Sequence, residues 1–185
     1  MPKNQKLPAG DGKNAVTIRP YLHEQDFEAL RQWSTDARTH AMWCADLLPY
    51  PPDAEGFADA LRQIQARSGD QPYLAADAAG EAVGFFCAMP IPQTKEIMLK
   101  FVIVDPARRG QGIGQRMLRA AVRMLFAQTD ADAVQLMVFA ENPAARACYR
   151  HAGFSERSLT PDAFRFGDET WSRCNMVIRR ADMES

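Results

Sequence analysis

The chain has 185 residues and a formal net charge of −1, and 46% of its residues are hydrophobic and 24% charged. Such a chain is long enough to bury a core as one globular domain, and its overall charge excludes a general attraction to nucleic acid. One segment departs from this balance, because residues 106–129 contain five arginines and no acidic residue. A neutral chain with one basic segment suits a small anionic ligand.

Residues 1–14 are polar and lack the apolar stretch of a secretory signal, so we expect a disordered tail ahead of a single domain over 15–185. No apolar run reaches the length that spans a membrane. The cysteines are scattered, form no Cys-x-x-Cys pair and lie in or beside apolar segments, at Cys44, Cys87, Cys148 and Cys174. We expect free, buried thiols, which indicate a reducing, cytoplasmic setting.

The first elements are a strand and two helices. A short strand is predicted over 15–19, and apolar residues at helical spacing predict a helix over 24–37. The segment 41–52 is apolar but irregular, and it ends in Leu-Pro-Tyr-Pro-Pro. Asp53 can cap a second helix, which ends near Ser68.

Three strands follow, and the first two form a hairpin around a turn at 77–80. They cover 72–76, 82–89 and 96–104, with Pro90-Ile-Pro92 interrupting the pattern before the third. The third strand is apolar on both faces near its end, as expected for a central strand that is buried on two sides.

The rest of the chain alternates helices and strands. The elements are a helix over 113–128, a strand over 133–140, a helix from an Asn142 cap to Gly153, and strands over 163–166 and 172–179. This order predicts a mixed α/β or α+β sheet with helices on both faces.

A glycine-rich turn separates the central strand from the long helix. Gly110, Gly112 and Gly114 remove side chains where the helix starts, so backbone N–H groups can point outward with nothing in front of them. A helix N-terminus of this kind attracts anions, phosphates above all, and Arg108 and Arg109 add positive charge. The turn therefore predicts a site for a phosphorylated ligand.

Other interpretations of this turn differ in strength. It is not a P-loop, because no Gly-Lys-Ser/Thr follows. A dinucleotide site is an alternative. Dinucleotide-binding turns are followed about 20 residues later by an acid that binds the ribose, and Asp130 and Asp132 lie at about that distance. A glycine turn without a ligand is a further alternative.

Two motifs resemble the signatures of the GNAT acetyltransferase superfamily. Val104-Asp105-Pro106 followed by Arg109-Gly-Gln-Gly-Ile-Gly114 is similar to its acetyl-CoA signature, and the stretch from Asn142 to Phe154 is similar to its second signature. The resemblance covers about residues 15–180. It implies a GNAT-like α/β (α+β) fold, in which a mixed, mostly antiparallel central sheet of about seven strands has helices on both faces.

The resemblance also implies an activity and the residues that carry it. The activity is acetyl-CoA-dependent transfer of an acetyl group directly to a primary amine of a small molecule or peptide. The coenzyme pyrophosphate would be bound by the turn residues Arg108, Arg109, Gly110, Gln111, Gly112, Ile113 and Gly114. The pantetheine arm would pair with the strand end Phe101, Val102, Ile103 and Val104, where a free N–H would stabilise the oxyanion.

Asn142 and Tyr149 are seven residues apart and therefore lie on the same side of a helix. By the resemblance, Asn142 contacts the coenzyme arm and Tyr149 protonates the departing thiolate as general acid. A phenol is neutral at pH 7 and can donate to sulfur. The alternatives are a core aromatic for Tyr149 and a simple helix cap for Asn142, and capping leaves the amide N–H₂ free.

The resemblance does not identify the general base. Many relatives place a glutamate where this chain has Met98 and Met137. Glu96 is our candidate, because it lies two residues from Met98 and hence on the same strand face. Glu141 and His40 are lesser candidates.

Acceptor recognition is expected from the first two helices and the last two strands. The aromatic and apolar residues are Trp33, Trp43 and those within 47–52 and 164–171. The acids among them are Asp46, Asp53, Asp168 and Glu169. The expected partners are acetyl-CoA, an amine and, as an open option, a second copy of the chain. Metal, membrane and nucleic acid are not expected. The alternatives are a non-catalytic coenzyme A-binding sensor or scaffold and a nucleotide-binding module.

Overall fold

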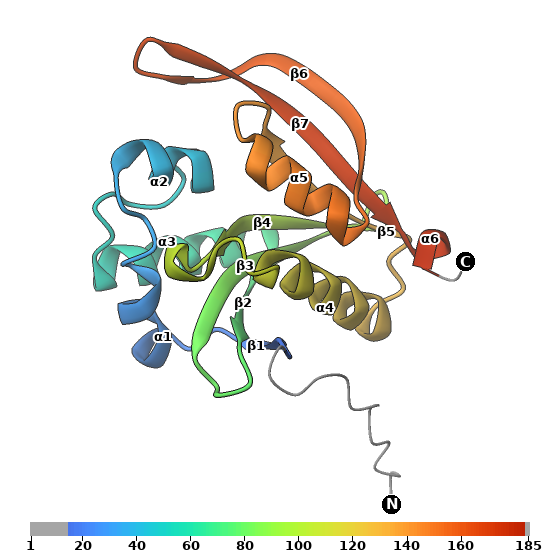
Figure 1. Ribbon diagram of the computed structural model, residues 1–185, viewed down its shortest axis with the longest axis horizontal. Coiled ribbons are helices and arrows are strands. Elements are labelled where there is room, and N and C mark those ends of the chain that lie inside the picture. Colours follow the sequence, from blue (N-terminus) through green and yellow to red (C-terminus); the bar gives the residue numbers. More distant parts are fainter. Residues whose placement is uncertain (1–14, 184–185) are drawn as a thin grey trace, which may run out of the picture.

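The computed structural model describes residues 15–183, so the tail expected over 1–14 lies outside the described residues. Within them, seven strands form one sheet in the order β1-β2-β3-β4-β5-β7-β6 (Figure 1). Neighbours are antiparallel except for β4 and β5, which are parallel. The predicted mixed, mostly antiparallel sheet is therefore confirmed. The strands are β1 (Thr17–Pro20), β2 (Gln71–Ala76), β3 (Ala82–Ile91), β4 (Glu96–Val104), β5 (Ala133–Phe139), β6 (Ser155–Phe166) and β7 (Glu169–Arg179).

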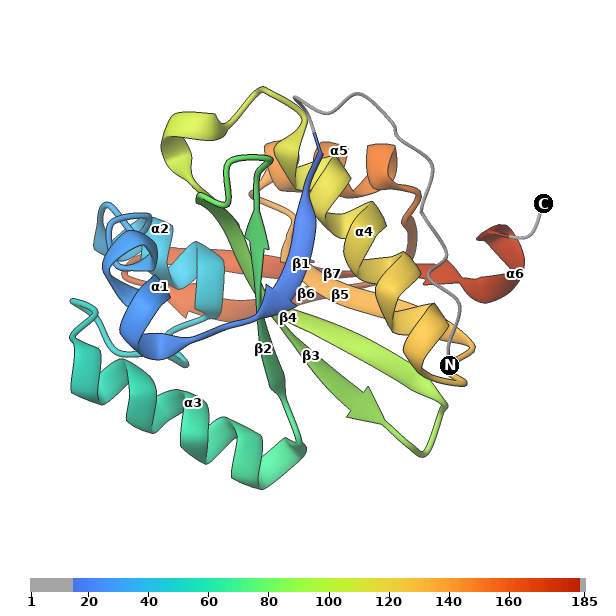
Figure 2. The same cartoon turned by 90° about the horizontal axis from the view of Figure 1, so that it is seen from below.

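Helices cover both faces of this sheet (Figure 2). They are α1 (His23–Leu30), α2 (Ala37–Cys44), α3 (Ala54–Ser68), the 3₁₀ turn η1 (Pro106–Arg108), α4 (Ile113–Gln128), α5 (Pro143–Ala152) and α6 (Arg180–Met183). One core lies beneath α4 and α5, and a second joins α1, α2 and α3 to the opposite face. No helix within residues 15–183 is long and apolar enough to cross a membrane.

The helix predicted over 24–37 ends early, at Leu30, and a second helix begins only at Ala37. Asp36 starts this second helix, because its side chain accepts a hydrogen bond from the backbone N–H of Thr39 at 2.8 Å. α2 therefore occupies the beginning of the segment 41–52, which was predicted to be irregular. It ends where Ala45 adopts a left-handed backbone, with φ of 49°.

Two strands extend further than their sequence patterns indicate. The strand predicted over 82–89 continues through Pro90 to Ile91. Its partner β2 begins opposite Ala88 and leaves the edge of β3 beyond that point free, where proline is tolerated. The strand predicted over 163–166 begins at Ser155. β6 is an edge strand and is exposed along most of its length, so it lacks an alternating apolar pattern.

The two parallel strands separate at the middle of the sheet. β4 and β5 pair from Glu96 with Ala133 as far as Leu99 with Leu136, and β4 then continues five residues to Val104. No pair joins the two strands beyond that point among the described residues. The facing edge of β4 is therefore left without a strand partner.

A β-bulge at Phe101 turns β4 over near the point where the strands separate. Phe101 has a left-handed backbone, with φ of 53°, and the β3–β4 register shifts between Phe85 and Cys87. Leu99 packs into the core beneath α4, whereas Phe101 and Ile103 pack into the core of α1–α3. Residues two apart normally share a face, so the bulge exchanges the faces of the strand.

Candidate active site

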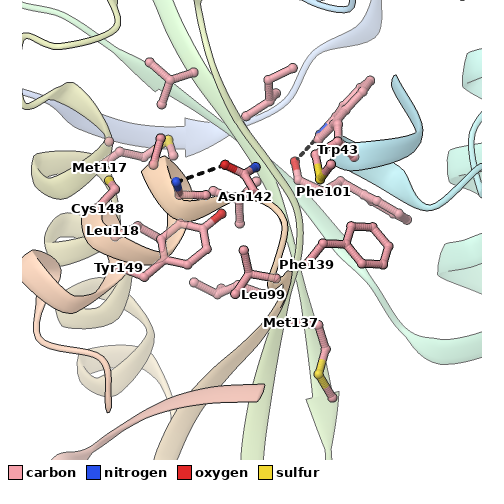
Figure 3. A pocket seen from close by; sticks show the side chains of 18 of the residues that line it. Trp43, Leu99, Phe101, Met117, Leu118, Met137, Phe139, Asn142, Cys148 and Tyr149 are labelled. Carbon is pink, nitrogen blue, oxygen red and sulfur yellow. Dashed lines mark hydrogen bonds between the residues drawn. The ribbon is translucent and has the colours of Figure 1, made fainter. Parts of the chain in front are cut away.

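A cavity of about 920 Å³ opens between the diverging ends of β4 and β5 (Figure 3). Its walls come from α2, from β4, from the turn before α4 and from the start of α5, and β7 contributes Arg173. It therefore connects the helix N-termini on one side of the sheet with the side chains of α2 on the other.

The glycine turn, residues 108–114, forms one end of the cavity. Gly110 and Gly112 have φ of 75° and 72°, a left-handed conformation that glycine adopts without strain. Gly112 is the N-cap of α4 and supplies no capping side chain, so the first N–H groups of the helix are left for other acceptors. This geometry suits an anion at the helix N-terminus.

The charged and polar side chains of the turn have different surroundings. Arg108 lines the cavity but pairs with Asp77 of the β2–β3 turn at 3.1 Å. Arg109 lines the cavity and is exposed, with no ion pair among the described residues. Gln111 does not line the cavity, and its side chain lies 3.4 Å from the carbonyl oxygen of Ala107. Arg109 is the better placed of the two arginines to bind a phosphate.

Gly114 lines the cavity and also allows α4 and α5 to approach each other closely. A Cβ atom at this position would lie 2.8 Å from the Cys148 sulfur, closer than real Cβ contacts allow. Arg116, which belongs to neither of the two sequence motifs, lies against the same turn. Its Nη1 atom is 3.1 Å from where a Gly112 Cβ would be. Its position four residues after Gly112 is the signal that could have revealed it.

Asn142 and Tyr149 both face the cavity from α5 (Figure 3). The Asn142 side-chain oxygen caps α5 by accepting a hydrogen bond from the N–H of Ala145 at 3.1 Å, which leaves the amide nitrogen free. The Tyr149 ring is buried, and its hydroxyl has no hydrogen-bond partner within residues 15–183. Burial raises the pKa of Tyr149 well above its ordinary value, so the phenol keeps its proton at neutral pH.

The bulged end of β4 forms the cavity wall between these features. Phe101, Val102, Ile103 and Val104 all line the cavity. The Phe101 carbonyl oxygen accepts a hydrogen bond from the Trp43 indole N–H at 2.7 Å (Figure 3). Trp43 on α2 therefore holds the strained residue from the far side of the sheet.

The carboxylates considered as general bases are all engaged elsewhere. Glu96 lies outside the cavity lining, where it pairs with Arg157 at 2.8 Å and accepts a hydrogen bond from Gln135. Glu141 lines the cavity, and both of its oxygens lie 3.1 Å from the backbone N–H of Ser172.

His40 is buried and its two ring nitrogens are both occupied. They contact the Ser34 hydroxyl at 2.9 Å and the Leu48 carbonyl at 3.0 Å. Met98 and Met137, the positions at which the family resemblance led us to expect glutamate, both line the cavity. The structure therefore brings no free carboxylate to these two places.

The expected acceptor residues divide between the core and the cavity. Trp33 is buried in the core of α1–α3, whereas Trp43 and Leu47 line the cavity. None of the four expected acids lines it: Asp53 caps α3, Glu169 binds Arg38, and Asp46 and Asp168 are exposed. The cavity wall instead includes Met42, Met89, Phe139 and Arg173, which no sequence motif marks.

Residues 26–154 match the acetyltransferase (GNAT) family. The chain belongs to the GNAT acetyltransferase family. Over 135 residues it is 28% identical to a mycothiol acetyltransferase of Beutenbergia cavernae, covering 69% of this chain and 45% of the relative. The chain thus spans about half the length of this curated relative.

Solved structures share the fold of this GNAT chain. Spermidine N-acetyltransferase from Vibrio cholerae, in complex with CoA and spermine, superimposes with a TM-score of 0.77 at 16% identity, covering 92% of this chain and 98% of that one. AAC(6')-Ib in complex with ribostamycin and coenzyme A gives 0.75 at 20% identity, covering 92% and 97%. At these identities the likeness shows the fold alone.

Proposed function

We propose that this GNAT chain is an acetyl-CoA-dependent N-acetyltransferase that moves the acetyl group directly to a primary amine. The observation that carries the proposal is the cavity between β4 and β5. It joins the glycine turn, the free strand edge and Tyr149 to a region lined by α2. A coenzyme and an acceptor can therefore meet at the middle of the sheet.

When bound, acetyl-CoA supplies a thioester whose acetyl carbon is attacked by the amine. The exposed N–H groups at the start of α4, together with Arg109, hold the pyrophosphate. The unpaired edge of β4 hydrogen-bonds the pantetheine arm as an added strand would, and an N–H beside the bulge donates to the acetyl oxygen.

Tyr149 completes the transfer. As the new C–N bond forms and the C–S bond breaks, the Tyr149 hydroxyl donates its proton to the sulfur and later regains one from solvent. This phenol is protonated at neutral pH, because burial raises its pKa above the ordinary value. With methionines at positions 98 and 137, the proton of the amine passes to water and not to a glutamate at either position.

Thiol release from acetyl-CoA, measured across a panel of amines, tests the proposal. We expect turnover with at least one amine, and we expect Gly112→Asp to weaken coenzyme A binding more than a hundredfold by placing an anion before the turn. Gly80→Asp is the matched control, because Gly80 is also left-handed but nothing lies within 4 Å of its Cβ position. Tight coenzyme binding without turnover on any amine would instead indicate the non-catalytic binder, which the methionines at 98 and 137 favour.

We also propose a cytoplasmic setting and a single-domain enzyme whose partners are acetyl-CoA and an amine. Support for the setting comes from the cysteines, which are all free and of which Cys44, Cys87 and Cys174 are buried. Among residues 15–183, no group of three or more His, Cys, Asp or Glu side chains could hold a metal ion. The mechanism above needs none.

A further inference from the structure

The acceptor chamber, the part of the cavity between α2, β5 and β7, contains several cations. Arg38 on α2, Lys100 on β4 and Arg173 on β7 are among the residues that line the cavity. Among the cavity-lining residues of the described chain, Glu141 is the one acid, and both its oxygens face the N–H of Ser172. The cavity therefore offers no unengaged carboxylate to an acceptor that carries several positive charges.

Two of these cations are already neutralised by the protein. Arg38 binds both oxygens of Glu169, at 2.9 and 3.2 Å, and lies over the Trp171 ring. Lys100 pairs with the buried Asp70 at 2.7 Å. Neither has its full charge available for a ligand.

Arg173 differs from both. It has no ion pair and no side-chain hydrogen bond within residues 15–183, and its guanidinium lies 5.7 Å from the centre of the Phe139 ring. Arg173 and Phe139 are cross-strand partners at the end of β5, where β5 has left β4. The Phe139 ring therefore helps to position the Arg173 guanidinium, with its five N–H donors, in the cavity wall.

Apolar residues line the cavity from the two elements next to β7 in this region. Met42 and Trp43 come from α2, and Met137 and Phe139 come from β5, with Met137 47% exposed. A guanidinium in such surroundings binds a carboxylate with two parallel hydrogen bonds, and thioethers accommodate varied apolar groups.

We propose that the acceptor is an amine whose molecule also carries a carboxylate and an apolar side chain, the chemistry of a neutral amino acid, and that Arg173 selects it by binding the carboxylate. The inference rests on the proposed acetyl transfer. The apolar side chain lies against Met42 and Met137, and the carboxylate on Arg173 orients the amine toward β4. This acceptor class differs from the spermine and ribostamycin named with the structural neighbours.

Matched acceptors test this inference. L-Leucine, L-methionine and L-phenylalanine are compared with their carboxamides, which keep the amine and side chain but lose the carboxylate, and spermidine is added as a polycation. The amides hold more neutral amine at a given pH, so chemical reactivity alone would favour them. We expect the amino acids to have the higher kcat/KM and spermidine the lowest.

Variants at Arg173 distinguish binding of the acceptor carboxylate from a general structural effect of the substitution. Arg173→Met should lower kcat/KM for the amino acids about ten- to hundredfold and leave that for the amides within threefold. Arg173→Lys should recover part of the loss, since it keeps the charge without the planar fork. Arg38→Met is the matched control, because this cation is committed to Glu169 and its loss should change both acceptor types equally.

The outcomes are distinct. If no amine releases thiol although coenzyme A binds, the acetyl-transfer proposal fails and this inference fails with it. If amides or spermidine react at least as well as the amino acids, or if Arg173→Met lowers both acceptor types alike, the enzyme stands and the carboxylate-bearing acceptor is wrong.

Discussion

The proposed acid role of Tyr149 requires a phenol that is protonated at the working pH. The ring is packed into the core beneath α4 and α5, and burial raises the pKa of its hydroxyl. A raised pKa favours the neutral phenol, so ionisation begins above pH 10, the ordinary value for tyrosine, and not below it. The acid form is therefore fully present from pH 6 to 9, and kcat should not fall with rising pH in this range.

Tyr149→Phe should lower kcat about a hundredfold or more, because a positioned general acid typically contributes this much. Coenzyme A affinity should change less than threefold, since the ring and its packing remain. Steady-state kinetics and calorimetric titration measure the two effects. Tyr73→Phe is the control, because Tyr73 stacks on Phe86 and does not line the cavity. An unchanged kcat in Tyr149→Phe would remove the acid assignment.

Sequence patterns predict the helices of the coenzyme side well. The helix over 113–128 has the predicted bounds. Asn142 caps the start of α5 and Gly153 caps its end, as expected. These signals could be recognised because caps and apolar spacing act between residues that are close in the sequence. The break between α1 and α2 was missed, since Asp36 begins a new helix within an otherwise helical pattern.

The bulge in β4 could not be predicted in the same way. Left-handed backbone is expected of glycine, and here Phe101 adopts it because Trp43 and the packing of two cores hold it there. The hydrogen bond joins residues 58 positions apart. Contacts so distant in the sequence leave no local pattern, and the same is true of Arg173 beside Phe139.

At the scale of elements, the approach of α4 to α5 depends on Gly114. A methyl group there would lie 2.8 Å from the Cys148 sulfur, and overpacking of this kind costs about 1–3 kcal/mol. Helix propensity favours alanine by about 1 kcal/mol, so Gly114→Ala should destabilise the fold by a net amount of up to about 2 kcal/mol. Urea denaturation measures the difference.

The double variant decides whether that contact is the cause. In a Cys148→Ala background the obstacle is gone and Val104 is at an ordinary 3.5 Å, so Gly114→Ala should become neutral or slightly stabilising. Cys44→Ala serves as control, because Cys44 packs in the other core and its effect should add to that of Gly114→Ala. A destabilisation that persists in the Cys148→Ala background would mean that the turn itself, and not the helix contact, rejects the side chain.

For the whole molecule, the cavity lies where the sheet is least continuous. The strands β4 and β5 join the halves of the sheet through four residue pairs and then separate. The cavity lining includes the start of α4 on one half and the start of α5 on the other. A ligand that contacts both sites binds only when the halves are packed together, so its binding stabilises the folded chain.

Coenzyme A should therefore raise the thermal midpoint of the full chain. At a concentration a hundred times its Kd, linkage gives about 2.7 kcal/mol, and a domain of this size shifts by about 2–4 °C per kcal/mol, which predicts a rise of about 5–10 °C. Scanning calorimetry with and without coenzyme A measures the shift, and Gly112→Asp should abolish it. ATP and NAD at the same concentration are the discriminating ligands. If either gives a shift as large as coenzyme A, the glycine turn holds a nucleotide and not specifically the thioester carrier, and no shift with any of the three would mean that the turn binds no such phosphate.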